Sequence, residues 1–206
     1  MIADAPLASP ADLPAPDPAF RADLVALRRE LHQHPELGFQ EHRTAQRLRD
    51  WLTERGFEPS APMAGTGFVV DIHGDRPGPM VAYRADMDAL PIHEATDAPY
   101  RSLTPGAMHA CGHDAHMTVA CGVAVLARER RAEFAGTVRV LFQPAEEVSP
   151  SGAPAMIRAG ALDGVEAIYA VHMDPSQAVG RFGFRDGVIF LNRRLSGCSI
   201  LWRTGF

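Results

Sequence analysis

The sequence contains no lysine, and all 20 of its basic residues are arginine. We interpret this absence as a feature of genome composition, but it also excludes a lysine Schiff base or a catalytic lysine, because arginine keeps its charge. The 25 acidic residues leave a net charge of -5, and charges of both signs are dispersed along the chain. Since no basic face is available to neutralise a phosphate backbone, we expect no nucleic acid partner.

Cysteine is also scarce. Cys111, Cys121 and Cys198 are too few and too uneven for the disulfide framework of a small secreted domain, so we expect a reducing, cytoplasmic location. No apolar stretch approaches the roughly 18 to 20 residues that span a bilayer, which predicts no membrane role. Residues 1–18 are rich in proline and alanine and lack a basic segment followed by an apolar run, so we expect a loose N-terminal arm rather than a signal peptide.

Hydrophobic periodicity predicts an α/β fold. Apolar residues three and four apart from Phe20 to Leu31 predict a helix that ends near His34, and a second such period ends at Gly56, a residue suited to a helix C-terminus. Beyond these two helices, strands are predicted at 68–72, 80–84, 137–142 and 167–171, and helices at 115–127 and 152–159. We therefore predict a mixed sheet with helices on both faces, in which strands alternate with helices and ligands bind beyond the strand ends.

The densest group of metal-binding side chains lies between residues 108 and 116, where a thiol, three imidazoles and a carboxylate occur together. Cys111 and His113 are two residues apart, so in an extended or tightly turned backbone they share a face, and Gly112 permits a close approach. The alternative is an ordinary helix N-terminus with Asp114 as its cap, and we favour metal ligands over this alternative. His109 and His116 either lie behind the ligands, where they would orient them, or lie on the surface.

Two adjacent glutamates, Glu146 and Glu147, follow a predicted strand and Pro144. Taken alone, two charges at such a place more often form a solvated turn. Adjacent residues at a strand end point in different directions, however, so one carboxylate can bind a metal while its neighbour faces a metal-bound water as general base.

Two other strand ends carry polar residues. Asp86 and Asp88 close a predicted strand, where an aspartate can orient a histidine ligand, although an ordinary strand-ending turn explains them equally well. His172 directly follows another strand; a lone histidine is more often structural, but this one lies at a third strand end. The stretch that contains His32 and His34, followed by Pro35, is interpreted as a helix end and turn.

Five separated motifs stand out along the chain: LHQHPEL at 31–37, RADMDALP at 84–91, MHACGH at 108–113, QPAEE at 143–147 and VH at 171–172. Together they resemble the M20 metallopeptidase family, and most of all its amidohydrolase branch. This branch includes hippurate hydrolases, N-acyl-amino-acid amidohydrolases and auxin-conjugate hydrolases. The motifs occur in the family's order, and the resemblance covers about residues 24–187.

The resemblance implies a zinc-exopeptidase-like catalytic domain over residues 19–190, with two divalent metal ions (Mn, Zn or Co) that serve the hydrolysis of the amide bond of N-acyl amino acids or small peptides. Glu146 would be the general base. Asp88 falls where the family places an aspartate beside a metal ligand, and Asp114 is a second candidate for such a supporting position. Asp86 stands where other branches have a ligating histidine, and we do not assign it as a ligand. The implied metal ligands are Cys111, His113, Glu147 and His172.

Members of this branch are considerably longer, with a lid and dimerisation domain inserted after the segment that 179–183 resembles. The resemblance therefore implies a chain cut before that domain, with 191–206 as a divergent tail or the start of the lid. The family's last metal ligand and its lid histidine have no counterpart in this sequence. Two hypotheses follow: a metal-dependent amidohydrolase, or an inactive remnant or metal-binding module without turnover. The family's C-terminal half adds strands to the catalytic sheet, and without them the sheet would keep an exposed edge. We therefore also predict aggregation or a homo-oligomer.

Overall fold

The structure is a computed structural model that describes residues 16–175, and its centre is a four-stranded sheet. The strands are β1 (Phe68–His73), β2 (Arg76–Asp86), β3 (Ala135–Gln143) and β4 (Val165–Ala170), in the order β1-β3-β2-β4. β1 runs antiparallel to β3, whereas β2 is parallel to both β3 and β4. The predicted mixed sheet is therefore confirmed.

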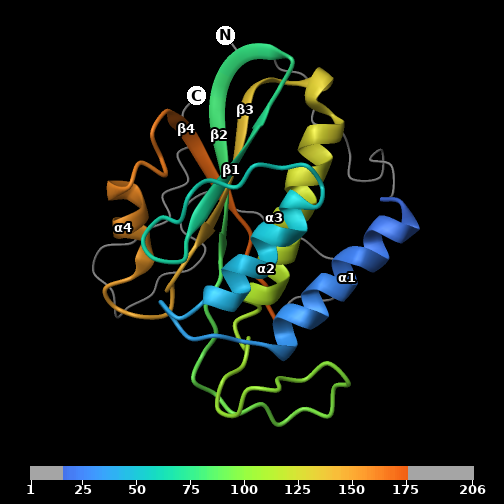
Figure 1. Cartoon of the computed structure of the whole chain (residues 1–206), viewed down its shortest axis with the longest axis vertical. Coiled ribbons are helices and arrows are strands. Elements are labelled where there is room, and N and C mark those ends of the chain that lie inside the picture. Colours follow the sequence, from blue (N-terminus) through green and yellow to red (C-terminus); the bar gives the residue numbers. More distant parts are fainter. Residues whose placement is uncertain (1–15, 176–206) are drawn as a thin grey trace.

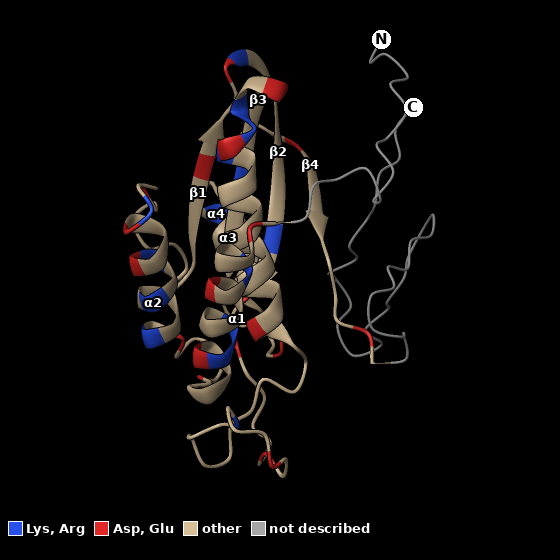
Figure 2. Cartoon of the chain, turned by 90° about the vertical axis from the view of Figure 1, so that its right-hand side faces the viewer, with Lys and Arg blue, Asp and Glu red and all other residues tan. Residues whose placement is uncertain are grey.

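Helices cover both faces of this sheet (Figure 1). Three lie on one face: α1 (Pro18–Gln33), α2 (His42–Thr53) and α3 (His113–Glu129). The short helix α4 (Gly152–Arg158) lies on the other face, and a 3-10 turn, η2 (Arg131–Glu133), leads into β3. Arginines and acidic residues stand near one another along the helices (Figure 2). Within the described part of the chain, no helix combines the length and apolar character needed to cross a membrane.

The prediction that strands alternate with helices fails at one place. β1 and β2 follow each other with only residues 74–75 between them, and β3 lies between the two strands in the sheet. No crossover helix is needed here, because β1 and β2 run in opposite directions. The expected boundaries at residues 1–18 and 191–206 lie almost wholly outside the described residues, apart from α1 beginning at Pro18.

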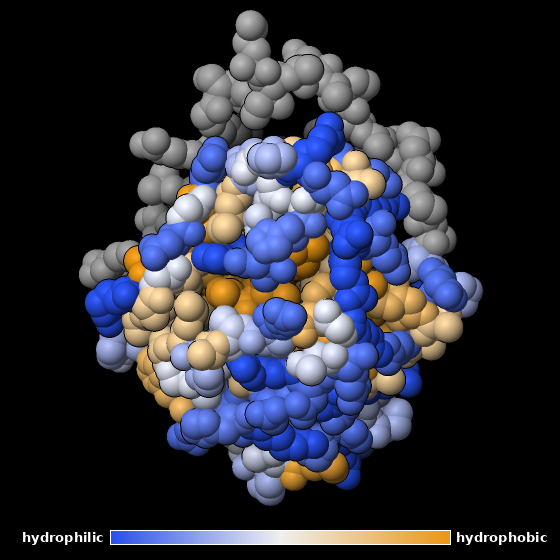
Figure 3. Space-filling view, turned by 45° about the horizontal axis from the view of Figure 1, so that its top comes forward, coloured by the Kyte–Doolittle hydropathy of each residue, from blue (hydrophilic) through white to orange (hydrophobic). Residues whose placement is uncertain are grey.

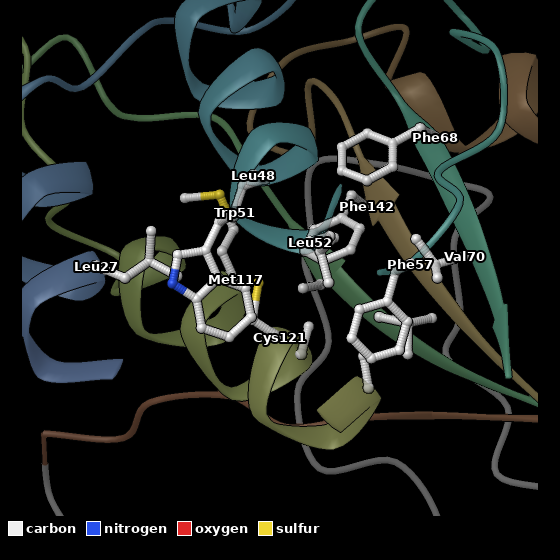
Figure 4. Packing of buried hydrophobic residues seen from close by; sticks show 14 of the residues in the cluster. Leu27, Leu48, Trp51, Leu52, Phe57, Phe68, Val70, Met117, Cys121 and Phe142 are labelled. Atoms are coloured by element: carbon white, nitrogen blue, oxygen red, sulfur yellow. The ribbon is translucent and has the colours of Figure 1, made fainter. Parts of the chain in front are cut away.

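The main core lies between the sheet and the three helices on one face. Trp51 of α2 lies beside Leu27 of α1 and near Cys121 of α3 (Figure 4). The rings of Phe68 and Phe142, which are partners in neighbouring strands, stack with their centroids 4.6 Å apart. Each fully buried side chain of this size contributes about 1.5–3 kcal/mol. A smaller cluster beneath α4 covers the opposite face: Val69, Leu141, Met156 and Ala161.

The two ends of the sheet differ in character. The carboxyl ends of the parallel strands β2, β3 and β4 meet at the same end as the beginning of α3, so the sequence motifs converge there. Figure 3 looks toward the opposite end, where an apolar hollow is surrounded by polar side chains. An open groove lined by residues such as Phe57, Ile72 and Arg128 also lies toward that end, away from the motifs.

Candidate metal centre

Three of the four expected metal ligands form one compact group. The ligand atoms of Cys111, His113 and Glu147 all lie within 4.8 Å of one another. The fourth, His172, places its Nε2 atom 3.4 Å from the Cys111 Sγ atom. The donors come from the loop before α3, the first residue of α3, the turn after β3 and the segment after β4.

The ring of His113 is held in one orientation. Its Nδ1 atom lies 2.7 Å from the backbone carbonyl oxygen of Asp88, to which it donates a hydrogen bond. Its Nε2 atom is buried, has no hydrogen-bond partner among the described residues, and lies 3.6 Å from a carboxylate oxygen of Glu147. A histidine whose Nδ1 donates to a carbonyl while Nε2 faces other donor atoms has the arrangement typical of a metal ligand.

The charge around His113 favours a cation at this place. Burial opposes protonation of the ring, but contacts with Asp88, Cys111 and Asp86 raise the pKa of His113 to about 11. The surrounding groups therefore supply enough negative charge to hold a proton on Nε2 well above neutral pH. The same anionic surroundings, together with thiol, imidazole and carboxylate donors, fit a divalent metal ion.

Asp88 holds the turn that carries the two glutamates. One of its carboxylate oxygens accepts a hydrogen bond from the backbone N–H of Glu146 and the other from that of Glu147, each at 2.9 Å. Burial alone would raise the pKa of Asp88, but the neighbouring ring of His113 and the hydrogen bonds from the two amides hold it below its usual value. Asp88 thus contacts His113 and the glutamate turn at the same time.

Glu146 lies on that turn beside Glu147 and is half-buried. Burial raises the pKa of Glu146, and the neighbouring carboxylates of Asp86 and Glu147 raise it further. The preceding residue, Ala145, has a φ angle of +52°, in the left-handed region. This bend lies immediately before the two glutamates, at the end of β3.

Asp86 and His116 form a buried pair next to these donors. The His116 Nδ1 atom lies 2.7 Å from an oxygen of Asp86, and Nε2 lies 2.9 Å from the backbone nitrogen of Met173. A backbone N–H can only donate, so Nε2 accepts and Nδ1 carries the proton that it donates to Asp86. Burial would raise the pKa of Asp86, but its contact with Arg84 and the bond from His116 lower it.

Asp86 and His116 also lie within 4.8 Å of His113 through their ligand atoms. Because both nitrogens of His116 are engaged, however, its ring presents no lone pair to a metal ion in this arrangement. The pair instead fixes the backbone of Met173, directly after His172. Sequence reasoning left the position of His116 open, and its contact with residue 173 has no signal in the sequence.

The interpretation of Asp114 as a helix cap is wrong. Gly112, with a φ angle of +83°, is the N-cap of α3, and a Cβ atom there would lie 2.9 Å from the side chain of Met173. Asp114 is buried in the first turn, where its carboxylate contacts His32 Nδ1 at 2.8 Å and Arg28 Nε at 2.7 Å. It therefore ties α3 to α1 directly behind His113.

Sequence reasoning also missed His32, which was interpreted as a helix end. His32 is buried and contacts Glu94 at 3.3 Å in addition to Asp114. The only signal was its spacing of four residues from Arg28, which places the two on one face of α1. His109 is also buried, and burial lowers its pKa to about 4, so this histidine is neutral at physiological pH.

The class of the molecule follows from its sheet and its donor set. A mixed α/β sheet with thiol, imidazole and carboxylate side chains at the carboxyl ends of parallel strands is an architecture suited to metal-assisted hydrolysis. Residues 82–202 match the profile of peptidase family M20/M25/M40. The chain belongs to this family.

Similar proteins support the assignment. The chain is 48% identical over 172 residues to an N-acetylcysteine deacetylase of Bacillus subtilis (strain 168), an alignment that covers 83% of this chain and 45% of that protein. It is 46% identical over 177 residues to the IAA-amino acid hydrolase ILR1-like 6 of Arabidopsis thaliana, covering 86% of this chain and 37% of that protein.

A solved structure has the same fold. The crystal structure of the Bacillus subtilis YXEP protein, described as a dinuclear metal binding peptidase from the M20 family, matches with a TM-score of 0.81 and 47% sequence identity. The match covers 84% of this chain and 48% of that one. The chain thus spans about half the length of the relatives it matches. The resemblance inferred from the five motifs is confirmed at the level of family and fold.

Proposed function

We propose that this chain carries the catalytic portion of a metal-dependent amidohydrolase, which cleaves the amide bond of N-acyl amino acids or small peptides. The observation that carries the proposal is the group of Cys111, His113 and Glu147, with a second glutamate next to the last of them. The names of its relatives support the substrate class, since one is a deacetylase of an N-acetyl amino acid and another a hydrolase of IAA-amino acids.

The proposed metal ligands are Cys111, His113, Glu147 and His172. Their donor atoms and the surplus of negative charge around His113 suit one or two divalent cations, and zinc, manganese and cobalt all accept such donors. When bound, divalent cations lower the pKa of a coordinated water and polarise a substrate carbonyl.

Glu146 is the proposed general base. A carboxylate oxygen of Glu146 takes a proton from the attacking water, and the resulting carboxylic acid returns that proton to the nitrogen of the leaving amine. Asp88 keeps this side chain at the site by holding the amides of Glu146 and Glu147. The two adjacent glutamates can therefore divide the roles of ligand and base.

The test is release of free amino acid from N-acetyl amino acids by the full chain, supplied with Mn²⁺, Zn²⁺ or Co²⁺ in turn. Glu146→Gln should lower the rate about 100-fold or more, because it removes the proton acceptor and leaves the ligands in place. Glu129→Gln, an exposed glutamate at the end of α3, is the matched control. Equal rates in the unaltered chain and in Glu146→Gln would overturn the assignment.

The second candidate function is metal binding without turnover. Measuring the metal bound to the chain beside the release of amino acid separates the two candidates, because a chain that retains metal but releases no amino acid supports the second. We also propose a cytoplasmic location, since the thiol of Cys111 is a proposed ligand and must stay reduced. The division into an arm at 1–18, a catalytic domain at 19–190 and a tail at 191–206 stays a prediction.

A further inference from the structure

Glu41 is a buried acidic residue that the proposed reaction does not use. Its exposed fraction is 0%, although it stands at the N-cap position of α2. Its side chain does not cap that helix. The carboxylate of Glu36 does so instead, by accepting hydrogen bonds from the backbone N–H of Arg43 at 3.1 Å and of Thr44 at 2.7 Å.

The carboxylate of Glu41 reaches across the fold to the turn that carries the two glutamates. One oxygen accepts a hydrogen bond from the backbone N–H of Ala145 at 2.8 Å, across 104 positions of sequence. The other accepts a hydrogen bond from the hydroxyl of Thr66, also at 2.8 Å. Burying a carboxylate is unfavourable unless its oxygens are hydrogen-bonded, and both oxygens of Glu41 are.

Ala145 is the residue at which the chain bends before the glutamates. Its φ angle of +52° is unfavourable for a residue with a Cβ atom and persists only where the surroundings hold it. Its N–H is held by Glu41, and its carbonyl accepts a hydrogen bond from the N–H of Gly152 at 2.9 Å. Gly38, just before α2, packs against the same residue, since a Cβ atom there would lie 3.3 Å from that of Ala145.

Two buried carboxylates therefore hold three consecutive amides. Glu41 holds the N–H of Ala145, and Asp88 holds those of Glu146 and Glu147. The two carboxylates come from different parts of the fold, one from the start of α2 and one from the loop after β2. Without Glu41 the N–H of Ala145 would lose its acceptor, and the left-handed bend would rest on the Gly152 hydrogen bond and the packing of Gly38 alone.

We propose that Glu41 is a positioning residue for Glu146 and Glu147. By fixing the bend at Ala145, it sets the directions in which the two glutamates leave the backbone, so that one side chain reaches the ligand group and the other stays available as the base. The inference rests on the proposed function, because it assigns Glu41 a role through the proposed ligand and base.

The test is titration of the full chain with Co²⁺ alone. Binding is monitored through the visible absorption of the ion and through its charge-transfer band with the thiolate. Glu41→Ala should weaken Co²⁺ binding at least about 10-fold, as is usual when a residue that supports a metal ligand is removed. Glu41→Gln should recover most of that loss, because its amide oxygen can still accept from Ala145 while the Thr66 hydroxyl turns to accept from the amide nitrogen.

The matched control is Glu36→Ala. It removes the cap of the same helix and lowers the melting temperature, but the Glu36 carboxylate bonds to the start of α2 rather than to the turn, so Co²⁺ affinity and the thiolate band should be unchanged. If Glu41→Ala is insoluble, Glu41→Asp replaces it. The aspartate side chain keeps the charge but is one methylene too short to reach Ala145, and it should weaken Co²⁺ binding likewise.

The inference would be overturned if Glu41→Ala, or Glu41→Asp in its place, bound Co²⁺ with the same affinity as Glu36→Ala. The proposed function would then remain intact. Glu41→Gln behaving like Glu41→Ala would also overturn the inference, since the charge rather than the hydrogen bond would then be what acts. Absence of Co²⁺ binding by the unaltered chain would instead overturn the proposed metal centre, and the inference with it.

Discussion

Replacing Asp88 with asparagine should destabilise the chain without changing its shape. The two carboxylate oxygens of Asp88 each accept one backbone N–H, at 2.9 Å, and the residue is 1% exposed. The asparagine side chain is isosteric with aspartate but offers one oxygen and one NH₂ group. One of the amides of Glu146 and Glu147 would then face another donor in place of its acceptor.

The magnitude follows from the bonds lost. A buried donor left without an acceptor costs about 1–3 kcal/mol, and a hydrogen bond to a charged group contributes about 1.5–3 kcal/mol. Both figures include the loss of the same N–H···carboxylate hydrogen bond, so they do not simply add. We expect the free energy of unfolding to fall by about 2–4 kcal/mol. At about 2–4 °C per kcal/mol for a chain of this size, the melting temperature should fall by roughly 4–16 °C.

The assay is urea unfolding of the full chain at about pH 7.5, monitored by circular dichroism. A chelator is present so that metal binding does not contribute to the measured stability. Asp97→Asn, an exposed aspartate in the loop after β2, is the control and should stay within about 0.5 kcal/mol of the unaltered chain. An Asp88→Asn value within the same range would refute the argument that this carboxylate holds the turn.

Three further predictions concern other contacts. The hydrogen bond that His32 donates to the carboxylate of Asp114 raises the pKa of His32 above its usual 6.5 despite burial, so His32 stabilises the fold fully below about pH 6.5 and loses this effect as pH rises through the folded-state pKa. The stability difference between the unaltered chain and His32→Gln should therefore shrink above that pH, and a constant difference from about pH 5 to 9 would contradict this. His116→Phe removes the bond to Met173 and should weaken Co²⁺ binding about 10-fold or more in a direct titration; unchanged binding would show that residue 173 needs no such anchor. Among residues 16–175, β4 is an edge strand of the sheet and Ile168 is 37% exposed, so we expect self-association in sedimentation velocity, against which a monodisperse monomer would count.

Much of the fold could be predicted because it is encoded locally. The spacing of Leu24, Leu27 and Leu31 defines the buried face of α1, and the apolar run at 137–142 lies within β3. The order β1-β3-β2-β4 could not be predicted, because it depends on which strands pair across long stretches of chain. The short link between β1 and β2 likewise gives no indication that β3 inserts between them.

The candidate site divides in the same way. Cys111 and His113 stand out because their side-chain types are uncommon at such close spacing, and the adjacent pair of Glu146 and Glu147 suggested a division of labour. The contacts that hold these residues were not predictable. Glu41 resembles any helix-start glutamate until its oxygen is seen 2.8 Å from the backbone nitrogen of a residue 104 positions away.

We propose above all that Cys111, His113, Glu147 and His172 form a metal centre. The most direct test is the metal content of the purified, dialysed full chain by elemental mass spectrometry, with Cys111→Ser measured alongside. We expect about one to two metal ions per chain, and a lower ratio in Cys111→Ser, because the variant loses one of the four proposed ligands. A ratio near zero in the unaltered chain, or one that Cys111→Ser leaves unchanged, would contradict it.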